Sequence, residues 1–339
     1  MSIESSIASH ADAAPQARHR RLPLIPASFF GIVLGVAGLG NAWRASSTLW
    51  PLPTEIGETL EMAAALIWFV LILLYGAKWI VAPREAIAEV ENPIQCCFVG
   101  LVGVATMLVA LGAHPYVPGA AEILFGLGAA FTLIFALWRT GVLWRGGRDV
   151  GATTPVLYLP AVAGSFVTAI AAGTFGYADW GQLAFGAGFF TWLAIESVLL
   201  HRLYTAPTLP EPLRPTLGIQ LAPPAVGNLA YLSVTTGTPD MLSHAMLGYA
   251  LFQTLLLLRL LPWVMKQPFA GSYWAFTFGV TALASSALRM VARGNDGAVA
   301  LLAPYLFSFA NIVVGLVAIG TVWLLLRGRL LPTQSPSRS

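Results

Sequence analysis

The segment SYWAFTFGVTALASSALRM, residues 272–290, contains side chains that suit the passage of a solute through an apolar helix. Its threonine and serine hydroxyls can hydrogen-bond a passing ion, and Arg289 supplies a positive charge near the end of the segment. The rings of Phe276 and Phe278 stand among small residues and are large enough to close a narrow path. Residues two apart on a helix point about 200° apart, so only one of these rings can face such a path.

Residues that usually carry catalysis or bind metals are scattered along the chain. His114, His201 and His244 are far apart in the sequence, and no two of them have the one-turn spacing of a metal site. Cys96 and Cys97 are adjacent, so no disulfide framework is possible. The sequence therefore predicts neither an enzyme nor a protein that holds a metal or another cofactor.

Only 10% of the 339 residues are charged and the mean hydropathy is +0.74, whereas soluble domains carry about 25% charged residues. We therefore expect a polytopic integral membrane protein, with lipid and not nucleic acid around it. We expect cytoplasmic tails over residues 1–21 and 328–339 and a transmembrane domain over 22–327. The first apolar run is too long for a cleaved signal peptide, so it should remain as a span.

Apolar stretches of about 20 residues, the length that crosses a membrane, divide the chain into ten expected spans. They are residues 24–44, 56–81, 93–113, 119–144, 155–175, 180–204, 215–237, 240–265, 270–292 and 297–327. The breaks between them are short, so successive spans should pack as antiparallel hairpins. The predicted fold is all-α, with ten transmembrane helices arranged as five helical hairpins.

Basic residues predict the orientation of these spans. With the N-terminus in the cytoplasm, 15 of the 18 Lys and Arg residues fall on the cytoplasmic side. Because cytoplasmic loops are enriched in Lys and Arg, we expect both termini to be cytoplasmic, in the bacterial inner membrane. The three outer residues, Arg44, Arg289 and Arg293, should attract anions to the outer mouth or else reach lipid phosphates.

The odd-numbered spans share a pattern of proline and glycine. Proline occurs near their starts, where it breaks helical hydrogen bonds, and we expect the interiors of the even-numbered spans to be free of it. Each odd span also carries a glycine directly after an apolar or aromatic residue: Gly31, Gly100, Gly164, Gly227 and Gly279. Broken helices are stable in lipid only where protein or water satisfies the backbone. The pattern predicts a quasi-five-fold ring of odd spans around a central pore, with the even spans outside.

Carboxylates do not occur in the five odd-numbered spans, whereas Glu58, Glu61, Glu122 and Glu196 fall in even-numbered spans. Cation paths and proton relays usually contain carboxylates. A pore lined by the odd spans therefore suits anions or neutral solutes. For Glu122 and Glu196 we expect a role mainly in subunit packing.

Three stretches resemble the tellurite-resistance/C4-dicarboxylate transporter (TehA-like) family, to which plant slow-type anion channels are related. They are PASFFGIVLGVAGLGNAW (26–43), PTLGIQLAPPAVGNLAYL (215–232) and YWAFTFGVTALASSALR (273–289). The resemblance extends from residue 22 to residue 327, which leaves only the tails. It implies a homotrimer in which each subunit has its own pore through the odd helices.

In that family a phenylalanine of the ninth helix closes the pore. The resemblance places this gate at Phe278, with Phe276 as the competing position, and places Gly31 where a small side chain faces the pore. We expect the other repeated glycines, Thr281 and Ser285 to line the pore as well.

The expected function is that of a channel or transporter for small anions such as chloride or nitrate. The alternative is a proton-coupled carrier for C4-dicarboxylate, sulfite or tellurite, with Glu196 or a histidine as its proton-binding group. The residues themselves leave the physiological anion open.

Overall fold

The computed structural model describes residues 23–331, so the tail expected over 1–21 and most of that expected over 328–339 lie outside this range. Within it the chain forms helices and no strand. The α-helices are α1 (Phe30–Ser47), α2 (Thr54–Val81), α3 (Pro83–Glu91), α4 (Cys96–Val99), α5 (Leu101–Ala113), α6 (Pro118–Trp144), α7 (Gly164–Thr174), α8 (Ala178–Thr205), α9 (Ala222–Val234), α10 (Met241–Val264), α11 (Thr277–Ala292) and α12 (Ala298–Leu326). Short 3-10 or π segments are η1 (Ala27–Phe29), η2 (Val150–Ala152), η3 (Pro155–Leu157), η4 (Leu159–Ala163), η5 (Glu211–Leu221) and η6 (Gly271–Phe276).

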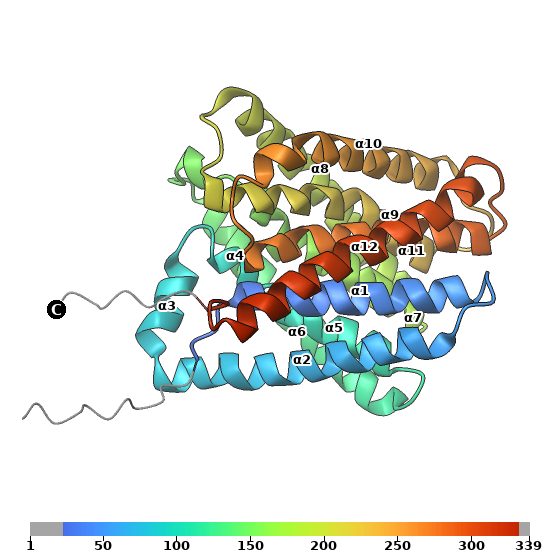
Figure 1. Cartoon of the computed structure of the whole chain (residues 1–339), viewed down its shortest axis with the longest axis horizontal. Coiled ribbons are helices and arrows are strands. Elements are labelled where there is room, and N and C mark those ends of the chain that lie inside the picture. The colour runs from blue at the N-terminus through green and yellow to red at the C-terminus, as the bar shows by residue number, and fades with distance from the viewer. Residues whose placement is uncertain (1–22, 332–339) are drawn as a thin grey trace, which may run out of the picture.

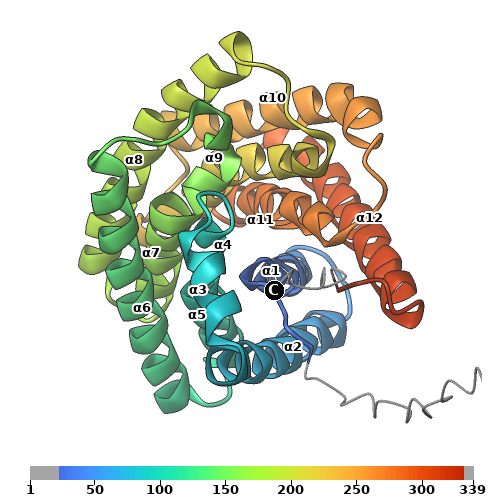
Figure 2. The same cartoon turned by 90° about the vertical axis from the view of Figure 1, so that its left-hand side faces the viewer.

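The long helices form five hairpins, in which α1 contacts α2, α5 contacts α6, α7 contacts α8, α9 contacts α10 and α11 contacts α12. The first helices of the hairpins also contact one another in the order α1, α5, α7, α9, α11 and back to α1, which closes a ring. Figure 2 shows this inner ring with the second helices outside it. The quasi-five-fold arrangement of hairpins therefore exists in the described chain.

Eight helices of the described chain are long and apolar enough to cross a membrane. The outer helices α2, α6, α8 and α12 are only 22% buried over their most apolar windows, whereas Cys96–Ala113 in the inner ring is 83% buried. An apolar helix that is exposed on one side fits contact with lipid. The protein is thus an all-α integral membrane protein. Helices α1 and α9 lie in the inner ring beside these helices but are not among the eight, so the count of ten spans stays a prediction.

The inner helices begin in irregular turns, as their prolines predict. Pro155 and Pro160 stand in η3 and η4 before α7, and Pro215 stands in η5 before α9. The expectation that even spans lack proline was wrong, because Pro262 lies inside α10 and Pro304 inside α12. Both lie near a helix end, where one lost backbone hydrogen bond disturbs few turns.

Helix α3 was not expected, because its charged residues resemble a loop in the sequence. It brings Glu89 to the start of the first hairpin, where Oε1 accepts a hydrogen bond from the backbone N–H of Ala27 at 2.7 Å. Glu89 Oε2 accepts hydrogen bonds from Lys78 Nζ at 2.7 Å and from Tyr75 Oη at 3.2 Å. The Lys78 and Glu89 side chains are each 7% exposed, so this ion pair joins η1, α2 and α3 away from water.

We predict that Lys78→Met will lower stability by about 3 kcal/mol, because it leaves the Glu89 carboxylate buried without its cation. The measurement is thermal unfolding of the detergent-purified protein. The matched control is Arg84→Met, which removes an exposed cation from α3. Equal melting temperatures for the two variants would contradict the prediction.

Candidate functional site

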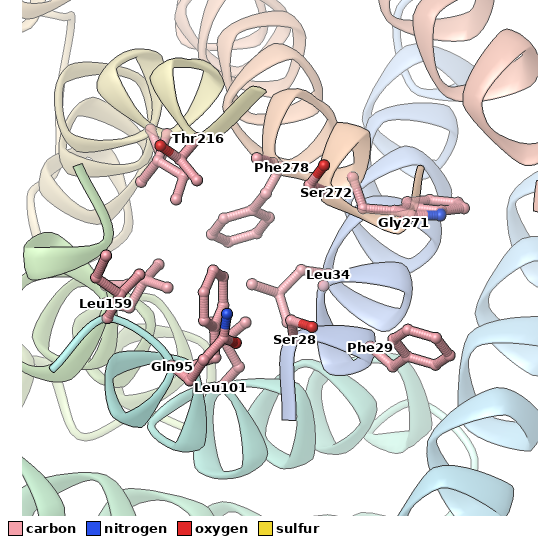
Figure 3. A pocket seen from close by; sticks show the side chains of 18 of the residues that line it. Ser28, Phe29, Leu34, Gln95, Leu101, Leu159, Thr216, Gly271, Ser272 and Phe278 are labelled. Carbon is pink, nitrogen blue, oxygen red and sulfur yellow. The ribbon is translucent and has the colours of Figure 1, made fainter. Parts of the chain in front are cut away.

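A cavity of about 550 Å³ opens at the end of the bundle where residues 23 and 331 lie, and we call it the proximal cavity. All five inner helices or the turns before them contribute to its wall, which is mostly apolar. Figure 3 shows Leu34, Leu101 and Leu159 on this wall. Its uncharged polar side chains include Ser28, Gln95, Thr216, Gln267 and Ser272.

A second cavity of about 370 Å³, the distal cavity, lies toward the other ends of the same five helices. Its wall includes two guanidinium groups and an imidazole. The polar residues lining it are Asn41, Arg44, Thr48, His114, Thr174, Thr281, Ser285 and Arg289. Over residues 23–331, neither cavity is lined by Asp or Glu.

Phe278 is the one residue of the described chain that lines both cavities. Its ring extends from α11 toward the middle of the pocket, opposite Leu34 of α1 (Figure 3). Phe276 lines neither cavity. It packs against Gly218, where an added Cβ would lie 2.6 Å from Phe276 Cγ, and it stacks on Tyr273 with ring centroids 6.3 Å apart.

The repeated glycines do not share one environment. Gly31 lines the proximal cavity, and a Cβ there would meet only Trp274 Cβ, at 3.7 Å. The other four differ from the expectation, since they face neighbouring helices: Gly100 and Gly164 face α6, Gly227 faces Phe166 of α7, and Gly279 faces Leu221 and Ala222 at the start of α9. Their small size permits close helix contact rather than a wide path. Thr281 and Ser285 do line the distal cavity.

The three predicted outer arginines have different partners. Arg44 lines the distal cavity, but its guanidinium forms an ion pair with Glu58 at 2.6 Å and also donates to the Gly112 carbonyl. Arg293 lies off the cavity and donates to the carbonyls of Leu232 and Gly237. The charge of Arg44 is thus paired, and the charge of Arg293 lies off the cavity wall.

Arg289 keeps its charge available to the distal cavity. Its Nη1 donates to Ser233 Oγ at 2.7 Å, and no carboxylate pairs with it among the described residues. At the rim, Tyr116 donates its hydroxyl to Glu58, and that hydrogen bond raises the pKa of the phenol. The rim is therefore held by a closed Arg44–Glu58–Tyr116 cluster, while Arg289 sets the sign of the charge inside.

Two glutamates are buried behind the walls of the cavities. Glu196 accepts hydrogen bonds from four donors, which are Tyr158, Trp192, Tyr249 and Gln253. Glu61 lies against Gly40 of α1 and Gly112 of α5, and neither of its oxygens has a hydrogen-bond partner in the described chain.

The sequence pattern did not identify His114 or Tyr158 as cavity residues, because their positions depend on contacts between distant helices.

The profile of the "Voltage-dependent anion channel" (SLAC1) family matches residues 25–322. The Haemophilus influenzae "Tellurite resistance protein TehA homolog" is 36% identical over 306 residues, which cover 90% of this chain and 92% of that protein. The chain belongs to the voltage-dependent anion channel family. This membership confirms the resemblance inferred from the three sequence stretches.

More distant relatives include plant channels. The Arabidopsis thaliana "S-type anion channel SLAH3" is 24% identical over 88% of this chain and 48% of that protein. The "Guard cell S-type anion channel SLAC1" of the same plant is 25% identical over 78% of this chain and 49% of that protein. The family consists of channels and transporters rather than enzymes, in agreement with the scattered histidines and cysteines.

We predict that Gly38→Ala will destabilise the contact between α1 and α11 by about 1–3 kcal/mol. An added Cβ at Gly38 would lie 2.3 Å from Thr281 Oγ1 and 3.1 Å from Thr281 Cβ. The double variant Gly38→Ala/Thr281→Ala removes the closer atom and should recover part of the loss, as measured by thermal unfolding. Gly31→Ala is the control, since its Cβ has room, and a melting temperature for Gly31→Ala as low as that for Gly38→Ala would contradict this reasoning.

Proposed function

We propose that the protein passes small monovalent anions such as chloride and nitrate through the two cavities, and that Phe278 is the gate between them. The observation that carries this proposal is the position of Phe278 as the residue common to both cavity walls. An apolar ring across a narrow path excludes water and raises the barrier to an ion. Rotation of this ring away from the axis would join the cavities into one path.

The charges around the path support an anion rather than a cation. Neither cavity wall carries a carboxylate within the described residues, and Arg289 is an unpaired cation in the distal cavity. We further propose that the proximal cavity faces the cytoplasm, as the distribution of Lys and Arg predicts. A homotrimer with one pore in each subunit follows from the family resemblance and is tested by native mass spectrometry.

We predict that Phe278→Ala will raise chloride or nitrate current in planar bilayers by at least about tenfold, because it removes the barrier between the cavities. Reversal potentials under a salt gradient should follow the equilibrium potential of the anion. The matched control is Phe276→Ala, which removes a ring of the same size two residues earlier, at the end of η6 and outside both cavities. A folded Phe278→Ala protein with wild-type current, or equal increases in both variants, would overturn the gate.

A proton-coupled carrier is the second candidate, and Glu61 is the observation that favours it. This carboxyl is 5% exposed, has no hydrogen-bond donor among the described residues and touches two inner helices through Gly40 and Gly112. Glu196 fits the role less well, because four donors already satisfy its oxygens.

The two candidates differ in their response to a pH gradient. A carrier that uses Glu61 should lose anion uptake driven by a pH gradient in liposomes when Glu61 becomes Gln, whereas Glu122→Gln, a change at an exposed glutamate, should not have this effect. The channel proposal expects neither variant to alter the reversal potential. Uptake that saturates, follows the pH gradient and depends on Glu61 would replace the channel proposal with the carrier.

A further inference from the structure

The distal cavity holds a histidine that the proposed path does not yet use. His114, at the end of α5, lines the cavity together with Arg289 of α11. Its Nδ1 is buried and has no hydrogen-bond partner in the described chain. Its ring packs on Phe175 with centroids 4.4 Å apart, and Phe175 in turn stacks on Phe125 at 5.1 Å. Apolar rings thus fix the imidazole in position, while its Nδ1 has no partner among the described residues.

His244 provides an informative contrast. It also lies toward the distal end of the bundle, at the start of α10, but it lines neither cavity. Its Nδ1 lies 2.7 Å from the Asp240 carbonyl, and its Nε2 lies 2.7 Å from Asn295 Nδ2. Both nitrogens of His244 therefore have protein partners, whereas Nδ1 of His114 has none within residues 23–331.

Arg289 lines the same distal cavity as His114, so its positive charge acts on that cavity. Ser233 Oγ donates its own proton to the Leu229 carbonyl at 2.8 Å, so its lone pairs are free to accept from Arg289 Nη1 at 2.7 Å. This bond orients the guanidinium without neutralising it. The nearby Arg44 is different, since Glu58 takes up its charge.

We propose that Arg289 and protonated His114 form an anion-binding site in the distal cavity, with His114 making occupancy depend on the pH on that side. The ligand class is a small inorganic anion, such as chloride or nitrate, which accepts hydrogen bonds from both cationic groups. The site rests on the proposed anion path, since it lies between Phe278 and the distal mouth.

The sign of the pH effect follows from the groups around His114. Arg289 of α11 and Arg44 of α1 line the cavity with His114, and Glu58 of α2 is paired with Arg44. Glu61 of α2 lies against Gly112, two residues before His114. Phe175 and Phe125, from the side of α7 and α6, are uncharged. A histidine changes charge between about pH 5 and pH 8. Acidification of the distal side therefore adds a positive charge beside Arg289 and strengthens anion binding, and alkalinisation removes it.

The test uses the Phe278→Ala background, so that the gate does not limit the current. We predict that the half-saturating concentration of nitrate on the distal side falls by about threefold or more from about pH 7.5 to about pH 5.5. His114→Gln should abolish this difference, and Arg289→Gln should raise the half-saturating concentration at both pH values. His244→Gln should retain the full difference, because His244 lies off the cavity.

A second measurement detects nitrate binding at the site and does not depend on conduction. Nitrate should raise the melting temperature of the purified protein more at about pH 5.5 than at about pH 7.5, since a ligand that binds the folded state stabilises it. His114→Gln should remove that difference, and His244→Gln should keep it.

The outcomes separate the site from the function. A pH difference that survives His114→Gln in both measurements overturns the site, even if Phe278→Ala conducts anions well. A His114-dependent thermal shift in a protein that conducts no anion supports the site and overturns the proposed channel instead. The absence of any nitrate-dependent shift or saturation at either pH also overturns the site.

Discussion

A charge inside a membrane protein is stable only if it is paired or faces water, and the arrangement of this bundle follows from that constraint. Lys78 pairs with Glu89 where α2 and α3 meet, and Arg44 pairs with Glu58 at the distal rim. Glu196 has no cation but accepts four hydrogen bonds. Because these groups are satisfied within the protein wall, they contribute little net charge to the cavities. Among the described residues, the unpaired charge on the distal wall belongs to Arg289, and Arg329 lies unpaired on the proximal wall.

The same constraint explains why the inner helices of the hairpins were predictable from the sequence and why helix α3 was not. Prolines before α7 and α9 break the backbone ladder, and such breaks must lie inside the bundle rather than against lipid. Prolines near the start of a span, rather than proline anywhere in it, therefore predict which helices form the inner ring. Helix α3 escaped prediction because its stability comes from the buried contacts of Glu89, which join residues far apart in the chain.

The repeated glycines show a limit of pattern reasoning. A small residue on an inner helix can widen a path or let a second helix approach closely. A glycine in the sequence does not distinguish these two roles. Gly31 has open space beside it, whereas a Cβ at Gly164 would lie 2.1 Å from Thr132 Cγ2. The difference depends on how far each helix is rotated about its axis, which contacts with its neighbours determine. His114 was overlooked for the same reason, since only the packed ring places it beside Arg289.

The rotation of α11 is determined by contacts on both sides of it. Gly218 of η5 leaves a notch that the ring of Phe276 fills, and Gly35 and Gly38 of α1 leave room for Thr277 and Thr281. With Phe276 held toward η5 and the two threonines held toward α1, Phe278 is left to point toward the axis, as Figure 3 shows. The proposed gate thus depends on three glycines, of which Gly38 also lies beside the ring, since an added Cβ there would be 3.6 Å from Phe278 Cδ2. These three glycines lie outside the repeated pattern seen in the sequence, and they act by orienting the helix that carries Phe278.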